Sequence, residues 1–210
     1  IQFRRSGAGE VARIGFEPKA RPEPLMLPEG FKSGRVIDAD AGVAGVLVET
    51  SAWTRAGLTY AYDPQTNTFA DTRLNPQGRF DNVPGYESVE VEVKAQDGVM
   101  VPLSIITKSG LKRDGSNPAF LTGYGAYGRS RNVGFNPTTL AWLERGGVLA
   151  VAHVRGGGEF GEEWHLAGQK LTKPNTWKDF IACAEYLIAK GYTSPAKLAG
   201  QGGSAGGILI

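Results

Sequence analysis

A serine set among small residues stands at residues 202–206, where the sequence reads Gly-Gly-Ser-Ala-Gly. This pattern fits G-x-S-x-G, a tight strand-to-helix turn that exposes a nucleophilic serine. The backbone of such a serine is strained, so its neighbours must be small where the chain crowds itself. Ser204 is therefore the candidate nucleophile, and the backbone N–H of Ala205 is a candidate donor to an oxyanion. A glycine-rich loop that merely contains a serine is the alternative.

A nucleophilic turn of this kind needs a strand before it and a helix after it. We expect residues 197–201 to form that strand and residues 205–210 to begin the helix. Upstream, residues 118–123 are a short apolar run, and residues 148–154 are a nearly continuous one. The longer run is typical of a strand buried on both faces in a parallel sheet.

Two segments between these strands are expected to be helices. The first begins with the Asn-Pro pair at residues 136–137 and ends at the glycine pair at residues 146–147. The second covers residues 176–190, with Thr176 and Asp179 as a capping box and an apolar stripe along one face. Strand, helix, strand, helix, strand and turn, in this order, predict a doubly wound α/β sheet.

The first 85 residues have a different pattern, of short strands separated by turns. Strands are expected at residues 11–16, 43–50, 58–62 and 68–74. Short strands at this spacing suit a sandwich, a barrel or a propeller blade. Residues 75–86 are rich in proline, glycine and asparagine, which indicates a domain boundary. The expected domains are therefore residues 1–85 and residues 86–210.

The second domain is expected to open with a β-hairpin. Residues 88–95 alternate strictly between apolar and polar side chains, as a half-buried strand does. The Gln-Asp-Gly turn at residues 96–98 is a hairpin signal, and residues 99–107 provide the returning strand.

A nucleophilic serine needs a base, and neither histidine is placed to supply one. In hydrolases with this turn the acid and the histidine follow the serine, whereas His153 and His165 both precede Ser204. His153 ends a buried strand and is expected to be a hydrogen-bonded core residue, and His165 is expected to pack in a loop. Two histidines with no third ligand nearby do not make a zinc site, and no metal or cofactor is expected.

Two further glycine-rich loops precede the serine. Residues 122–128 follow an early strand of the sheet, which is where a second oxyanion donor should lie. Their residues Tyr124 and Tyr127 carry phenolic donors, although spacing alone favours an aromatic packing turn. Residues 155–159, Arg-Gly-Gly-Gly-Glu, lack the spacing of a phosphate or dinucleotide loop. We interpret them as a flexible turn. Ion pairs of Arg155 and Glu159 are expected to hold this turn in place.

Composition excludes several classes of partner. The formal net charge of +2 is spread along the chain without a basic run, which gives no case for nucleic acid or an anionic membrane. Cys183 is the only cysteine, so internal disulfides and cysteine-based metal clusters are excluded. The sequence opens at Ile1 without an initiator methionine or a signal peptide, as the interior of a longer polypeptide would. Both a cytoplasmic and a periplasmic location stay open.

Several of these motifs occur together in one known family. The motifs are residues 123–128 (Gly-Tyr-Gly-Ala-Tyr-Gly), residues 153–159 (His-Val-Arg-Gly-Gly-Gly-Glu), Trp164-His165, the segment from Asp179-Phe180 to Tyr192-Thr-Ser-Pro195, and residues 202–207 (Gly-Gly-Ser-Ala-Gly-Gly). With these motifs in this order, the chain resembles the prolyl oligopeptidase family of serine peptidases. The resemblance is dense from residue 88 to residue 210 and looser over residues 1–86.

The resemblance implies a fold, an activity and site residues. It implies the N-terminal half of an α/β-hydrolase catalytic domain, preceded by the end of a β-propeller that keeps large folded proteins out. By position, Ser204 matches the nucleophile, and Tyr124 matches the tyrosine that completes the oxyanion hole with the N–H of Ala205. Tyr127 matches an aromatic residue near the primary substrate pocket. The catalytic Asp and His of the family are expected downstream of residue 210, so the 210 residues alone are expected to be inactive.

The resemblance leaves the substrate preference open between cleavage after proline and cleavage after arginine or lysine. Ala205 and Tyr127 stand where prolyl oligopeptidases usually carry Asn and Phe, and this pattern is closer to oligopeptidase B. In either case the expected function is serine-type hydrolysis of short peptides. An esterase on the same fold is one alternative, and a non-catalytic binding module is another if the downstream Asp and His are missing.

Overall fold

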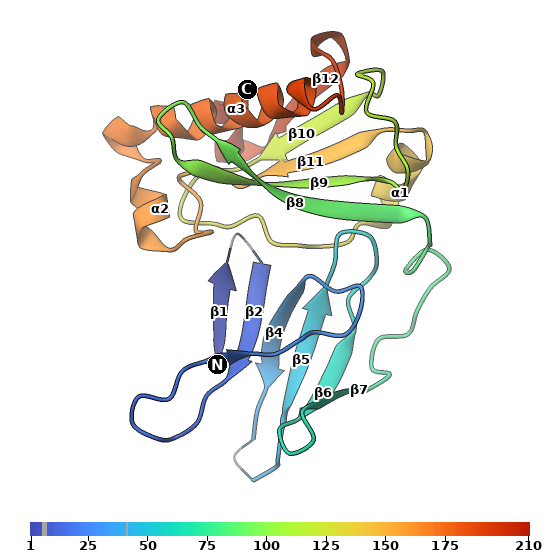
Figure 1. Ribbon diagram of the computed structural model, residues 1–210, viewed down its shortest axis with the longest axis vertical. Coiled ribbons are helices and arrows are strands. Elements are labelled where there is room, and N and C mark those ends of the chain that lie inside the picture. Colours follow the sequence, from blue (N-terminus) through green and yellow to red (C-terminus); the bar gives the residue numbers. More distant parts are fainter. Residues whose placement is uncertain (6–7, 41) are drawn as a thin grey trace. The chain divides into compact units, whose positions relative to one another are not determined.

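The computed structural model describes residues 1–5, 8–40 and 42–210 (Figure 1). By its contacts the chain divides into two compact units. Unit 1 consists of residues 1–83 and 132–136, and unit 2 consists of residues 84–131 and 137–210. In the part of the chain that is described, no helix has the length and apolar character needed to cross a bilayer.

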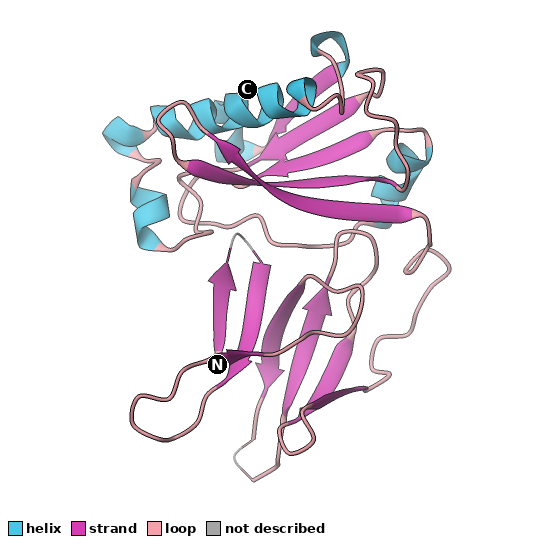
Figure 2. Ribbon diagram, in the orientation of Figure 1, coloured by secondary structure: helices cyan, strands magenta, loops and turns pink. Residues whose placement is uncertain are grey.

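Unit 1 consists of short antiparallel strands (Figure 2). One sheet has the order β1-β2-β3 and the other the order β4-β5-β6-β7. Their bounds are β1 Gln2–Arg5, β2 Ala8–Arg13, β3 Glu23–Pro24, β4 Ser33–Asp38, β5 Val46–Ser51, β6 Thr59–Asp63 and β7 Thr68–Asp71. Buried apolar side chains from both sheets, Val11, Val48 and Tyr62, pack in one cluster.

The structure confirms most of the strands predicted in unit 1 and corrects the position of one. Strands predicted at residues 43–50, 58–62 and 68–74 are β5, β6 and β7, each within three residues of its expected ends. The strand predicted at residues 11–16 is wrong in position, because β2 covers Ala8–Arg13 and pairs with the unpredicted β1.

Unit 2 contains a five-stranded sheet in the order β12-β10-β11-β9-β8. The bounds are β8 Tyr86–Lys94, β9 Met100–Lys108, β10 Ala119–Gly123, β11 Val148–Ala152 and β12 Leu198–Gly202. β8 and β9 form the predicted hairpin, and β9 is also antiparallel to β11. β10 is parallel to both β11 and β12. The sheet is therefore mixed, and β11 has only one parallel neighbour.

Helices of unit 2 connect these strands (Figure 1). They are α1 Pro137–Glu144, α2 Glu162–Leu166 and α3 Pro174–Ala189, with single 3₁₀ turns η1 Lys170–Thr172 and η2 Pro195–Lys197, and the 3₁₀ helix η3 Ser204–Leu209. Both predicted helices are present, and α1 begins at its proline as expected. The segment after Ser204 is helical as predicted, but it is 3₁₀ rather than α over the described residues.

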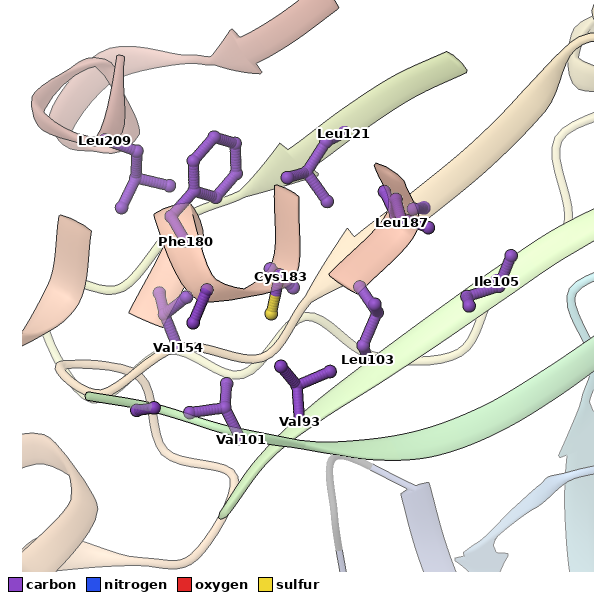
Figure 3. Close-up of a cluster of buried hydrophobic side chains, with 14 of the residues drawn as sticks. Val93, Val101, Leu103, Ile105, Leu121, Val154, Phe180, Cys183, Leu187 and Leu209 are labelled. Carbon is purple, nitrogen blue, oxygen red and sulfur yellow. The ribbon is translucent and has the colours of Figure 1, made fainter. Parts of the chain in front are cut away.

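The core of unit 2 lies between α3 and the sheet (Figure 3). Cys183 and Leu187 of α3 are fully buried, and they face Leu103 of β9 and Leu121 of β10. Because β9 alternates little and is buried along most of its length, it packs on both faces. This core fixes α3 against the strands whose carboxyl ends carry the candidate site. Cys183 is thus a small residue of this core.

The predicted capping box of α3 is wrong. The helix begins at Pro174, with Lys173 as its N-cap residue, and no side chain caps it. Thr176 instead donates from its hydroxyl to the carbonyl oxygen of Arg155 at 2.8 Å, and Asp179 binds the Arg155 side chain. Both residues lie fully buried on the inner face of α3, so their polar groups serve tertiary contacts rather than the helix end.

Candidate active site

Ser204 stands directly where β12 gives way to η3. Strand β12 ends at Gly202, and η3 begins at Ser204 itself. The backbone φ of Ser204 is +54°, in the left-handed region that residues other than glycine rarely adopt. Strain of this kind persists only where the surrounding structure imposes it, and it is common at functional sites. The Ser204 side chain is exposed, as a nucleophile that meets its substrate must be.

Only some of the small neighbours of Ser204 are required by space. A methyl group added to Gly202 would overlap the carbonyl oxygen of Gly206. A methyl group added to Gly206 would lie 3.1 Å from the carbonyl oxygen of Gly123, tighter than most real contacts. At Gly203 such a group would meet nothing within 4 Å. The expected crowding therefore holds at Gly202 and Gly206 but not at Gly203.

Tyr124 lies beside this turn although it is distant in sequence. Strands β10 and β12 are parallel and in register, with Gly123 opposite Gly202, so both end at the same edge of the sheet. Tyr124 is the residue after Gly123, and a methyl group on Gly206 would lie 3.2 Å from its ring. The two loops predicted to carry the nucleophile and an oxyanion donor are thus neighbours in space.

Tyr127 also has an unusual backbone. Its φ is +56°, and its side chain is 74% exposed. The next residue, Gly128, donates its N–H to the carbonyl oxygen of Gly156 at 3.1 Å, which ties this part of the loop to the Arg-Gly-Gly-Gly-Glu turn. The exposed ring of Tyr127 is available to contact a bound molecule.

The hydrogen bonds of the two histidines go to partners other than Ser204. His153 is 1% exposed, and its Nε2 lies 2.8 Å from the hydroxyl of Ser104. This confirms the prediction of a hydrogen-bonded core histidine. His165 lies on α2 and not in a loop, and its Nδ1 is 3.1 Å from the carbonyl oxygen of Gly156. The short helix α2 was not predicted.

The Arg-Gly-Gly-Gly-Glu turn is buried, so the prediction that it is flexible is wrong. Arg155 is 4% exposed and pairs with Asp179 of α3 and with Asp97 of the β8–β9 turn, each at 2.6 Å. These partners raise the pKa of the Arg155 guanidinium above its ordinary value. Glu159 is 2% exposed, and its carboxylate accepts the backbone N–H of Arg131 at 2.9 Å. Ion pairs do hold the turn, and the partners of Arg155, Asp179 and Asp97, lie outside it.

The pairing of Arg155 with Asp179 is a contact that sequence reasoning missed. The available signal was an acidic residue on the apolar face of a predicted helix, because a carboxylate is seldom buried without a cationic partner. Within the residues that the structure describes, no group of three His, Cys, Asp or Glu side chains is arranged to hold a metal ion.

The chain is similar in sequence to known peptidases. Residues 133–210 match the model of the Prolyl oligopeptidase family. The prolyl endopeptidase of Elizabethkingia meningoseptica is 44% identical over 135 residues, which are 64% of this chain and 19% of that protein. The chain thus spans about a fifth of the length of the first curated relatives it matches.

Solved structures resemble the chain over nearly all of its length. Oligopeptidase B from Leishmania major covers 99% of the chain, with a TM-score of 0.84 and 28% identity, and the chain covers 30% of it. Prolyl oligopeptidase B from Galerina marginata, bound to a 35mer hydrolysis and macrocyclization substrate, covers 100% with a TM-score of 0.85 and 30% identity, and the chain covers 30% of it.

The fold and its serine turn define the structural class of the chain. The chain has the α/β-hydrolase fold, preceded by part of a β-propeller, and the predicted fold class is confirmed. The family follows from the matches in sequence and structure together. The chain belongs to the prolyl oligopeptidase family of peptidases.

Proposed function

We propose that the whole protein is a serine-type oligopeptidase that hydrolyses internal bonds of short peptides through an acyl-enzyme on Ser204. The observation that carries this proposal is the left-handed backbone of Ser204 at the end of β12, with Tyr124 beside the same turn. Membership of a peptidase family supports hydrolysis of peptide bonds as the reaction.

In this mechanism the Ser204 hydroxyl attacks the peptide carbonyl and forms a tetrahedral intermediate. A histidine downstream of residue 210 takes the serine proton and then gives it to the leaving amine, and a downstream Asp orients that histidine. The Tyr124 hydroxyl and the N–H of Ala205 donate to the oxyanion. Water then hydrolyses the acyl-enzyme and restores Ser204. No metal or cofactor takes part.

Short peptides are the proposed substrates, and Tyr127 is proposed to contact them near the primary pocket. A related prolyl oligopeptidase B is described as bound to a 35mer substrate, which supports peptides as the class. The exposed ring of Tyr127 supports its role. We further propose that residues 1–85 are the last part of the propeller and residues 86–210 the first half of the catalytic domain. The change from one compact unit to the other between residues 83 and 84 supports a boundary in this region, although residues 132–136 belong to the first unit.

Two preferences at the cleaved bond are proposed as alternatives, cleavage after proline and cleavage after arginine or lysine. Ala205 and Tyr127 favour the oligopeptidase B pattern, whereas the curated relatives include prolyl endopeptidases. Paired fluorogenic peptides that differ only in Pro or Arg before the cut distinguish these two preferences in the full-length protein.

The decisive experiment compares Ser204→Ala with Ser116→Ala in the full-length protein. Ser116 lies in an exposed polar loop before β10 and serves as the control. We expect Ser204→Ala to abolish peptide hydrolysis and fluorophosphonate labelling, and Ser116→Ala to keep both. Labelling that survives in Ser204→Ala would contradict the proposal. Hydrolysis of esters without hydrolysis of peptides would favour an esterase, and neither activity would favour a binding module.

The 210 residues alone are proposed to lack turnover. The hydrogen bonds of His153 and His165 go to Ser104 and Gly156 and not to Ser204, which supports the proposal that the base lies elsewhere in the whole protein. Serine-dependent turnover by the purified 210-residue chain would overturn this proposal.

A further inference from the structure

The loop at residues 124–131, called here the tyrosine loop, follows β10 without regular secondary structure. It carries Tyr124, so its conformation decides where the proposed oxyanion donor points. A loop of this kind holds a precise geometry only when other segments fix its backbone. The contacts that fix it come from the Arg-Gly-Gly-Gly-Glu turn and from the start of α3.

Three anchors fasten the tyrosine loop within unit 2. At its end, the N–H of Arg131 donates to the buried carboxylate of Glu159 at 2.9 Å. At its middle, Gly128 donates to the carbonyl oxygen of Gly156. At its start, the ammonium group of Lys173 donates to the carbonyl oxygen of Gly125 at 2.5 Å. The Lys173 anchor is the side-chain contact nearest in sequence to Tyr124.

The space around Gly125 leaves no room for a side chain that could hold the backbone in place. Its φ is +63°, and a methyl group there would overlap side-chain atoms of Thr176 and come 2.6 Å from a methyl group of Val154. The site therefore requires glycine, which is also the residue with the greatest backbone freedom. The carbonyl oxygen of Gly125 accepts a hydrogen bond from the ammonium group of Lys173.

Lys173 is suited to this single contact. It is half-buried as the N-cap residue of α3, directly before the rigid proline at position 174. Burial lowers the pKa of the Lys173 ammonium. Among the described residues no carboxylate forms an ion pair with Lys173, so a partly desolvated cation is directed at one backbone carbonyl. A charged donor makes a stronger hydrogen bond than a neutral one.

We propose that Lys173 is a positioning residue that holds Gly125, and through it the neighbouring Tyr124, in the geometry needed to donate to the oxyanion. The inference rests on the proposed serine peptidase function. Oxyanion donation acts in the transition state, so loss of this contact lowers kcat and leaves KM nearly unchanged.

The test uses the full-length protein and a peptide substrate that it cleaves. Lys173→Met removes the donor and keeps the apolar stem, and Lys178→Met is the matched control, because Lys178 is exposed on the same helix. Loss of an entire oxyanion donor costs about 100- to 1,000-fold in kcat. Misplacement of one donor is expected to cost about 10-fold in Lys173→Met, with KM within about 2-fold. Lys178→Met is expected to keep the wild-type kcat.

A double-mutant cycle separates positioning from a general structural role. Tyr124→Phe removes the hydroxyl that Lys173 is proposed to position, and residues that act as a unit show non-additive effects. Adding Lys173→Met to Tyr124→Phe is therefore expected to lower kcat by less than about 2-fold. An equal 10-fold loss in both backgrounds would overturn the inference, because Lys173 would then act independently of Tyr124.

The remaining outcomes distinguish this inference from the proposed function. If Ser204→Ala stays active, the proposed function fails. If Ser204→Ala is inactive and Tyr124→Phe is slow, but Lys173→Met matches Lys178→Met, only the Lys173 inference fails. Should Lys173→Met not fold, as judged by circular dichroism, Lys173→Arg decides. It keeps a cationic donor and is expected to retain more kcat than Lys173→Gln, and equal rates for the two would contradict the inference.

Discussion

Arg155 and Asp179 form a buried two-point ion pair. The guanidinium Nε and Nη2 donate to the carboxylate at 2.9 and 2.6 Å, and the two side chains are 5% and 0% exposed. Asp179 also accepts the backbone N–H of Arg155 at 3.0 Å. One carboxylate of α3 thus fixes both the backbone and the side chain at the point where β11 ends.

Removal of one partner leaves the other as an uncompensated buried charge. Asp179→Ala is therefore expected to lower the free energy of unfolding by about 3–5 kcal/mol. The matched control is Glu49→Ala, because the Arg35–Glu49 pair has the same chemistry at 2.7 Å but both side chains are about half exposed. That variant is expected to cost less than about 1 kcal/mol. Chemical denaturation followed by circular dichroism measures both, and similar losses would contradict the prediction.

Arg155 also forms an ion pair with Asp97, and this contact makes the stability of the fold depend on pH in acid. Asp97 accepts from Nη1 of Arg155 at 2.6 Å, and this hydrogen bond lowers the pKa of the Asp97 carboxyl. Since the folded pKa lies below the unfolded one, the unfolded state binds the proton first as the pH falls. The contribution of Asp97 to stability is therefore complete above about pH 4 and is lost as the pH falls through the lowered pKa.

This acid dependence is measurable by substitution. Asp97→Asn removes the titrating group, so its stability is expected to fall less steeply than that of the wild type below about pH 4. Denaturation midpoints measured at intervals from pH 6 to the acid limit of folding give the two slopes. Parallel curves for the two proteins would show that Asp97 does not carry the effect.

The sequence allowed much of the fold to be predicted, because its signals are local. Apolar runs, the hairpin turn at residues 96–98 and the proline that begins α1 each act within a few residues. β4 escaped prediction because it opens with Ser33-Gly34-Arg35, residues of low strand propensity. Its pairing with β5, a tertiary contact, makes it a strand. Likewise, Thr176 and Asp179 match a capping pattern, but both bind Arg155, which lies in the loop after β11.

The candidate site was predictable only in part, because some of its contacts are local in sequence and others join distant residues. Ser204 stands in a short motif whose geometry follows from its glycines, so its turn was visible in the sequence. The contact between Lys173 and Gly125 spans 48 residues and uses a backbone acceptor, which leaves no mark on residue type. The burial of Arg155 required its two carboxylate partners, which lie 58 and 24 residues away.

The serine turn tolerates a side chain at one glycine and not at its neighbour. Gly202→Ala would place a methyl group onto the carbonyl oxygen of Gly206, and overpacking of this kind costs about 1–3 kcal/mol. Gly203→Ala meets open space at an ordinary φ of −104°, so its stability is expected to change by less than about 0.5 kcal/mol. Thermal unfolding of both variants checks this difference. Equal melting temperatures would contradict the crowding at Gly202.

Cys183 reports on the packing between α3 and the sheet. It is the only cysteine of the chain, it is 0% exposed, and burial raises the pKa of its thiol. The thiolate is the reactive form, so the native protein is expected to resist a thiol reagent such as dithionitrobenzoate until it unfolds. In Asp179→Ala the thiol is expected to react faster, because α3 loses its buried ion pair one turn away.

The control for this reaction is a second thiol in an exposed place. Ser116→Cys adds one in the exposed loop before β10 and is expected to react at once with one equivalent of reagent, while Cys183 stays protected. Reaction of Cys183 in the native wild type at the rate of the introduced cysteine would mean that α3 does not cover it. Protection of Cys183 that is unchanged in Asp179→Ala would show that the ion pair does not hold α3 against the sheet.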